Sequence, residues 1–282
     1  MAPLHRTHIR ANQPWWTINF GEIVEYRDLL WMLVVRDLTA VYKQTILGPL
    51  WFIIQPLITT LVFTVIFGKV AKVSTDGVPQ FVFYMCGTVL WNYFSGCMTQ
   101  GANSLVSNTN VLTKVYFPRL IIPLSGVFTN LAHFALNLVM FFGFYGYFFF
   151  FTSSGMKPHW ELVLFPLLVL QCALIGLGVG LWVAALTTKY RDLRFALTFL
   201  TQIWMYATPI VYPASLVVRP SMRLLLWSNP MSFIVESARW MFTGTGTVTI
   251  PAATLSIGMT LILLVSGLFL FNRVQRTFVD TI

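Results

Sequence analysis

The polar side chains that could take part in chemistry are few, and they lie inside long apolar runs. His133 shares one helix face with Asn130 and Asn137, because the three recur at positions i, i+3 and i+7. No carboxylate lies near His133 in the sequence, so no acid–base pair is indicated. Polar groups in membrane helices commonly bond to neighbouring helices, and we favour this role over the lining of a passage.

An enzyme embedded in a membrane needs a nucleophile, a metal cluster or paired carboxylates within reach of its substrate. No Asp or Glu lies clearly inside the apolar runs, and the cysteines have no metal-type spacing. Cys86, Cys97 and Cys172 are expected to be small buried hydrophobic residues. The sequence therefore predicts no catalytic residue, metal site or cofactor in this chain and argues against a membrane-embedded transferase.

A second group of side chains is suited to sugars. Gln55, Thr59 and Phe63 follow at intervals of four residues in the first apolar run, and Gln202 and Tyr206 do so in the fifth. Aromatic rings stack on the C–H faces of sugars, and amides bond to their hydroxyl groups. These residues are predicted to line a substrate path. The alternative is that the aromatic side chains belong to the belts at the two membrane surfaces.

The connection between residues 213 and 245 contains two apolar stretches that Asn229 and Pro230 separate. Each stretch is too short to cross a bilayer, so two re-entrant half-helices are predicted. Glu236 and Arg239 are three residues apart on one face of the second stretch and can pair. These four residues are candidates for an outer gate. The alternatives are an external loop with two surface helices, and a charge pair that serves packing alone.

The composition indicates a membrane protein, since 57% of the residues are hydrophobic and only 10% are charged. The formal net charge of +9 fits basic loops beside membrane spans. No basic groove with interleaved aromatic residues is present, so no nucleic-acid partner is predicted.

An all-α integral membrane fold with six transmembrane helices is predicted, with spans at about 50–70, 81–101, 121–151, 162–187, 195–212 and 252–271. Residues 1–49 are expected to form a cytoplasmic N-terminal part, 50–272 the transmembrane domain and 273–282 a cytoplasmic tail. The first 20 residues lack the apolar core of a cleavable signal peptide. With the N-terminus inside, most Lys and Arg residues fall on the cytoplasmic side, which favours cytoplasmic location of both termini.

The segment from Glu22 to Lys43 is predicted to be an amphipathic helix on the inner membrane surface. At 100° per residue its charged side chains gather on one side and most of its apolar side chains on the other. A simple interfacial anchor and an element that contacts another domain both remain open.

Four segments resemble, in wording, order and spacing, the polysaccharide-export branch of the type-2 ABC-exporter permeases. They are RDLTAVYKQTILGPLW, SNTNVLTKVYFPRLIIPLSG, TTKYRDLRFALTFLTQIWMYATPIVYP and LLLWSNPMSFIVESARWMFTG. The resemblance implies a homodimer of this chain bound to two copies of a separate ATPase subunit. This chain has no GxxxxGK[ST] loop, so ATP and Mg²⁺ would be bound by that partner.

The resemblance also implies roles for individual residues. A short cytoplasmic coupling helix and the amphipathic helix would contact the ATPase through Asn110, Lys114, Val115, Tyr116, Arg27 and Asp28. The lipid head group of the substrate would contact Arg36, Lys43 and Arg191. Ordinary inside-positive charge and snorkelling at the interface are the alternatives for the basic residues.

The substrate implied by the resemblance is an undecaprenyl-linked polysaccharide of O-antigen type, exported across the bacterial inner membrane. Capsule or teichoic-acid export are close variants. Export of a drug or small lipid is a further alternative, although its path would be expected to carry fewer aromatic residues suited to sugars.

Overall fold

The computed structural model describes residues 20–43, 46–108, 117–152, 155–190 and 192–277, and every regular element within these ranges is helical. The α-helices are α1 (Phe20–Glu25), α2 (Arg27–Lys43), α3 (Leu50–Phe63), α4 (Gln80–Ser107), α6 (Ile121–Phe151), α7 (Phe165–Thr187), α8 (Leu193–Ala207), α9 (Pro220–Ser228), α10 (Pro230–Thr243) and α11 (Ile250–Thr277). A π-helical segment (Thr64–Val70) extends α3, and 3-10 segments (Trp160–Leu164 and Ala214–Leu216) precede α7 and α9.

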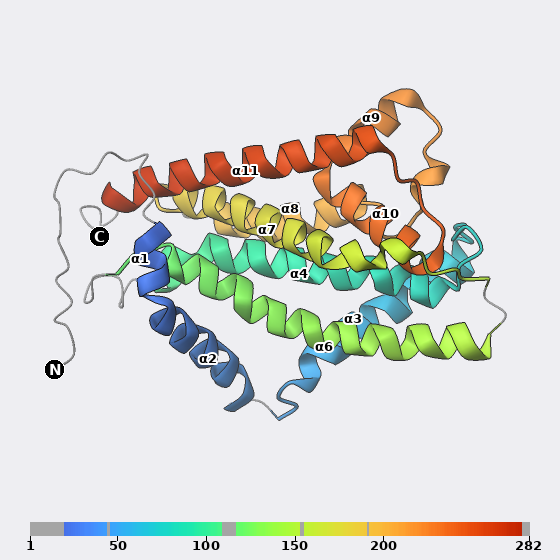
Figure 1. Ribbon diagram of the computed structural model, residues 1–282, viewed down its shortest axis with the longest axis horizontal. Coiled ribbons are helices and arrows are strands. Elements are labelled where there is room, and N and C mark those ends of the chain that lie inside the picture. The colour runs from blue at the N-terminus through green and yellow to red at the C-terminus, as the bar shows by residue number, and fades with distance from the viewer. Residues whose placement is uncertain (1–19, 44–45, 109–116, 153–154, 191, 278–282) are drawn as a thin grey trace.

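Helix α4 forms the centre of the bundle and packs against α7, α6 and α3 (Figure 1). Its first half is almost entirely buried, and Tyr84, Met85 and Phe94 have no exposed surface. Apart from Gln80 and Phe81 at its start, the positions that stay partly or fully exposed lie from Asn92 onward and include the polar residues Asn92, Ser95, Thr99, Gln100 and Asn103. Because protein surrounds most of α4, its polar residues do not have to face lipid.

Small residues let α4 and α7 approach each other closely. A Cβ atom on Gly180 would lie 2.8 Å from the carbonyl oxygen of Met98, and one on Gly176 would lie 2.8 Å from Cβ of Cys97. Side chains at these positions would separate the two helices, which is the packing that small-residue spacing in membrane helices provides.

Four described helical segments are long and apolar enough to cross a membrane, namely Leu50–Val70, Ile121–Phe151, Trp160–Thr187 and Ile250–Gln275. Helices α4 and α8, which correspond to the predicted second and fifth spans, are not among them. The predicted fifth span continued to Tyr212, but α8 ends at Ala207, where Thr208 turns to an extended backbone before Pro209. With 15 residues, α8 extends over roughly 22 Å, which is less than a bilayer core of about 30 Å.

The predicted amphipathic segment is divided at Tyr26 into α1 and α2. A small apolar cluster fixes it to the bundle, since Leu33 packs with residues of α6 and α11 such as Ile121 and Phe271. The opposite side of α2 leaves Trp31 and Met32 with 65% and 61% of their surface exposed. An apolar strip of α2 therefore remains unpaired in the subunit.

Helices α9 and α10 lie at the end of the bundle where α6 ends and α11 begins (Figure 1). They differ in burial: α10 buries every residue except Trp240, whereas Leu224 and Leu225 of α9 are 68% and 69% exposed. The predicted break between them falls at Asn229, as expected. Helix α1 and the last turns of α11 lie together at the opposite end of the bundle.

Candidate functional site

Glu236 and Arg239 form an ion pair inside the end of the bundle where α9 and α10 lie. Their nearest charged atoms are 3.0 Å apart, and each side chain is only 1% exposed. Arg239 also lies over the ring of Phe83 on α4, with 3.6 Å between its guanidinium carbon and the ring centroid. The predicted pairing of the two residues is confirmed, and it takes place within the protein interior.

The ion pair fixes two loops to α10. Ile210 lies in the loop between α8 and α9, and its carbonyl oxygen accepts a hydrogen bond from Nη2 of Arg239 at 2.7 Å. Glu236 accepts from the backbone nitrogens of Ala214 at 3.3 Å and of Thr247 at 3.1 Å. Buried charges are tolerated when hydrogen bonds of this kind satisfy them. The two side chains therefore connect both loops that flank the helix pair α9–α10, and a gate role for them stays a prediction.

Asn229 fixes the corner between α9 and α10 to helix α8. Its side-chain oxygen accepts from the backbone nitrogen of Met231 at 3.1 Å and from Trp204 Nε1 at 3.0 Å. Its amide nitrogen donates to the hydroxyl of Thr208 at 2.8 Å. Asn229 is thus the N-cap of α10, followed by Pro230 in the first turn, where proline is favoured. The polar break in the sequence is therefore a contact between three helices.

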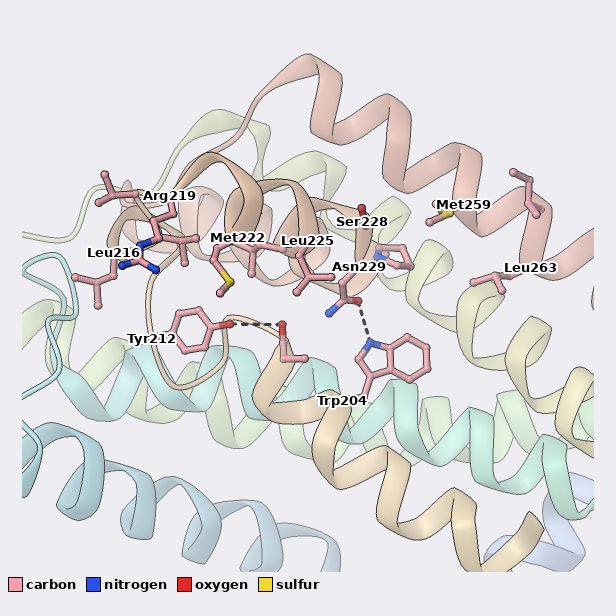
Figure 2. A pocket seen from close by; sticks show the side chains of 16 residues that line it. Trp204, Tyr212, Leu216, Arg219, Met222, Leu225, Ser228, Asn229, Met259 and Leu263 are labelled. Carbon is pink, nitrogen blue, oxygen red and sulfur yellow. Dashed lines mark hydrogen bonds between the residues drawn. The ribbon is translucent and has the colours of Figure 1, made fainter.

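An apolar cavity of about 950 Å³ lies between the end of α8, helix α9 and helix α11. Figure 2 shows Trp204, Tyr212, Met222 and Leu225 around it, with the Trp204–Asn229 hydrogen bond at one edge. Among its lining residues only Arg219 is charged.

The residues predicted to line a substrate path have different environments. Gln55, Gln202 and Tyr206 are exposed, while Thr59 is half-buried and donates its hydroxyl to the carbonyl oxygen of Gln55 at 3.0 Å. Phe63 is 5% exposed and packs against the ring of Tyr84. Exposed polar side chains on α3 and α8 are therefore available for such a path, among exposed apolar neighbours such as Ile58 and Ile203, whereas the ring of Phe63 faces α4.

A smaller polar pocket of about 300 Å³ lies between α3, α4 and α6. It unites Gln55 with the stripe of Asn130, His133 and Asn137, so two predicted groups of residues meet here. The ring of His133 stacks on that of Phe52 with 3.6 Å between the centroids.

The predicted hydrogen bonding between helices holds for one member of the stripe. Asn130 donates to the side-chain oxygen of Gln100 on α4 at 2.7 Å. Within the described part of the chain, His133 Nε2 and Asn137 Oδ1 are buried without a hydrogen-bond partner. Of the three residues, Asn130 bonds to a neighbouring helix, whereas His133 Nε2 and Asn137 Oδ1 do not.

The polar contact of Asn130 continues to the amphipathic helix. Gln100 donates to Asp37 of α2 at 3.3 Å, and Asp37 pairs with Arg36 at 2.7 Å. Arg36 also donates to the side chain of Asn108 at 3.3 Å. From the sequence, Asp37 was recognised only as part of the segment RDLTAVYKQTILGPLW, and Gln100 was not singled out, because 63 residues separate the two and no local pattern pairs them.

The other residues assigned to the inner surface are exposed or not described. Lys43 is exposed. Arg27 and Asp28 form a loose pair at 3.8 Å with side chains that are 78% and 93% exposed, so the pair contributes little to stability. The remaining candidates lie outside the described residues, namely Asn110, Lys114, Val115, Tyr116 and Arg191. Within the described residues no cluster of His, Cys, Asp or Glu could hold a metal ion.

Residues 28–243 match the family described as ABC-2 type transporter. This match covers well over half of the chain. The chain belongs to the ABC-2 type transporter family. Within this family it is 35% identical over 225 residues to the O-antigen export system permease protein RfbA of Myxococcus xanthus, covering 78% of this chain and 82% of the relative. It is also 28% identical over 257 residues to the O-antigen export system permease protein RfbA of Klebsiella pneumoniae, covering 90% and 94% of the two chains.

The family match includes the helices that carry the described site. It begins at Asp28 in α2 and ends at Thr243, the last residue of α10. The polar contacts of Asp37, the polar pocket and the buried ion pair therefore all lie in the part of this chain that is similar to the ABC-2 type transporters.

Proposed function

We propose that this chain is the permease subunit of an ABC transporter that exports an O-antigen type polysaccharide, linked to undecaprenyl, across the bacterial inner membrane. The observation that carries the proposal is the 35% identity, over most of both chains, to a protein described as an O-antigen export system permease. Capsule and teichoic-acid export are variants of the same proposal. Export of a drug or small lipid has no comparable support.

In the proposed transporter, two copies of this chain bind two copies of an ATPase subunit, which holds the ATP and Mg²⁺. The exposed residues Arg27 and Asp28 at the start of α2 provide a polar surface for that partner. Helix α2 reaches from this surface to α4 through Asp37 and Gln100. Movement of the ATPase would therefore act on a helix that is bonded to the centre of the bundle.

The proposed topology has six spans, with both termini in the cytoplasm. Helix α4 would provide the span that is not apolar enough on its own, and α8, with 15 residues, would provide the one that is too short on its own. Helix α1 and the end of α11 lie at the same end of the bundle, as an even number of crossings requires (Figure 1). The exposed Trp31 and Met32 of α2 suit the membrane interface, where aromatic and apolar side chains collect.

The glycan would pass along the exposed polar side chains of α3 and α8, where Gln55, Gln202 and Tyr206 are accessible. The lipid head group would contact Arg36 and Lys43 at the inner surface. In this proposal α9 and α10 are the re-entrant pair at the outer end, closed by the contacts of Asn229, Glu236 and Arg239.

Reconstitution tests the proposal directly. The chain and its partner ATPase are placed in proteoliposomes with lipid-linked glycan, and glycan reaching the opposite face is measured with a glycan-specific lectin. We expect transfer that depends on ATP and on both subunits. Transfer of small lipids or drugs without any transfer of glycan would contradict the proposal.

A further inference from the structure

The polar pocket between α3, α4 and α6 lies about midway along the bundle, far from the two membrane surfaces of the proposed topology. His133 is 12 residues from the start of α6, which places it roughly 18 Å along the helix. A bilayer core is about 30 Å thick, so this depth lies near its middle. Polar side chains at this depth need partners inside the protein, in water or in a ligand.

Two buried atoms of the pocket have no partner within the described part of the chain. Asn137 is 5% exposed, and its Oδ1 atom accepts no hydrogen bond. Nε2 of His133 is likewise buried and unpaired. Buried polar atoms are almost always bonded, because an unpaired one loses its hydration without compensation. Two residues of the lining therefore carry unbonded polar atoms, which a bound molecule can satisfy once the side chains of His133 and Asn137 rotate toward it.

The lining is neutral and partly aromatic. No Asp, Glu, Lys or Arg contributes to it, so it offers no counter-charge for a phosphate group. It combines amide and hydroxyl groups with the rings of Phe52, Tyr93 and Phe134. Amides together with aromatic faces suit a ligand that has hydroxyl groups and C–H surfaces. The chemistry that fits is that of a neutral sugar.

We infer that this pocket is a saccharide subsite, which binds one neutral sugar residue of the exported glycan during its passage. The inference rests on the proposed function and adds to it a place inside the subunit, separate from the basic residues at the inner surface. The volume of about 300 Å³ is at the small end of ligand sites, which suits a single sugar ring. Asn137 and His133 bond to its hydroxyl groups.

The wall of the subsite is connected to α2. Asn130, which lines the pocket, is bonded to Gln100, and Gln100 is bonded to Asp37. The position of α2 therefore influences the geometry of one side of the subsite. A sugar bound there would be sensitive to the movement of the helix that faces the ATPase.

Site-directed photo-crosslinking tests this inference in the full transporter. Benzoylphenylalanine is placed at Thr99, an exposed residue of the pocket, in cells that assemble and export the glycan. The matched control position is Val139, which is 72% exposed on another face of α6. After illumination the purified permease is probed for attached glycan. We expect about tenfold more glycan at Thr99 than at Val139. Asn92 provides a second position in the pocket in case the first variant is not produced.

A second comparison uses Asn137→Leu and Gln55→Leu in the same background. Each removes hydrogen-bonding groups from the subsite, and Gln55 is exposed, so its replacement leaves the packing intact. We expect capture at Thr99 to fall about tenfold, the effect of losing one hydrogen bond in an apolar environment.

The outcomes separate the subsite from the proposed function. If the transporter exports glycan but captures none at Thr99 or Asn92, the saccharide subsite is wrong while the proposed function stands. In a transporter that exports glycan without this capture, a cysteine is then placed at Thr99. If aqueous thiol reagents label that cysteine, the pocket holds water alone. If the chain with its ATPase exports no glycan at all, the proposed function fails and the subsite with it.

Discussion

Gln100 of α4 and Asp37 of α2 are joined by a hydrogen bond of 3.3 Å, although 63 residues separate them in the sequence. Asp37 at the same time pairs with Arg36 at 2.7 Å, and Gln100 accepts from Asn130 at 2.7 Å. Polar groups that bond in series support one another when they are shielded from water. This series links the amphipathic helix, the central helix and α6, and it ends at the wall of the polar pocket.

The first prediction concerns the strength of this link. In a double-mutant cycle with Asp37→Ala and Gln100→Ala, we expect a coupling of about 1.5 kcal/mol in the free energy of unfolding, because the acceptor is charged. Chemical unfolding in detergent measures it. The matched cycle with Arg27→Ala and Asp28→Ala should show no coupling, since those side chains are 78% and 93% exposed. Equal coupling in the two cycles would contradict the assignment.

The second prediction concerns the buried ion pair. Arg239→Met leaves the carboxylate of Glu236 buried without its counter-charge, so the free energy of unfolding should fall by about 3–5 kcal/mol. Glu236→Gln combined with Arg239→Met removes both charges and should cost less than the sum of the single changes. Thermal unfolding monitored by tryptophan emission measures both effects. Strictly additive losses would show that the two residues act independently.

The third prediction concerns Asn229. Asn229→Ala removes the helix cap of α10 and the bonds to Trp204 and Thr208, so stability should fall by about 2 kcal/mol. Asn229→Asp retains an oxygen for the cap and for Trp204, and it should restore most of the loss. Ser228→Ala is the neighbouring control, because the hydroxyl of Ser228 bonds only within its own helix to Leu224 at 2.9 Å. If the alanine and aspartate variants are equally unstable, the cap is not what Asn229 provides.

The fourth prediction separates the residues of the proposed path by exposure. In the transporter without nucleotide, cysteines at Gln55, Gln202 and Tyr206 should react with aqueous thiol reagents. A cysteine at Phe63 should be protected, since that side chain of α3 is 5% exposed and packs against Tyr84 of α4. Labelling of Phe63 that appears when ATP hydrolysis is trapped would show that α3 moves to expose it. If all four cysteines are protected in every state, these side chains pack between helices and do not line a substrate path.

The sequence predicted the helical elements well where apolar length alone decides them. The predicted span 121–151 coincides with α6, and the break at Asn229 coincides with the junction of α9 and α10. Both follow from local rules, because hydropathy sets the length of a span and proline with a capping residue starts a helix. Helix α8 was predicted too long, since the apolar residues beyond Ala207 form a buried loop that hydropathy does not distinguish from a helix.

The contacts of the site depend on distances that no local pattern contains. Glu236 and Arg239 could be paired from their spacing, but their bonds to Ala214, Thr247 and Ile210 arise only when loops distant in the sequence fold over α10. The meeting of Gln55 with His133 likewise depends on how α3 crosses α6. Spacing along one helix indicates which side chains share a face, whereas the opposing helix decides what that face meets.

The buried ion pair limits how the two loops beside α9 and α10 can move. One carboxylate and one guanidinium bind the loop before α9 and the loop after α10 at the same time. Neither loop can be displaced alone without leaving one of the two buried charges with fewer hydrogen bonds. Helix α10 and its two loops therefore travel together unless the hydrogen bonds that join Ile210, Ala214 and Thr247 to the ion pair break.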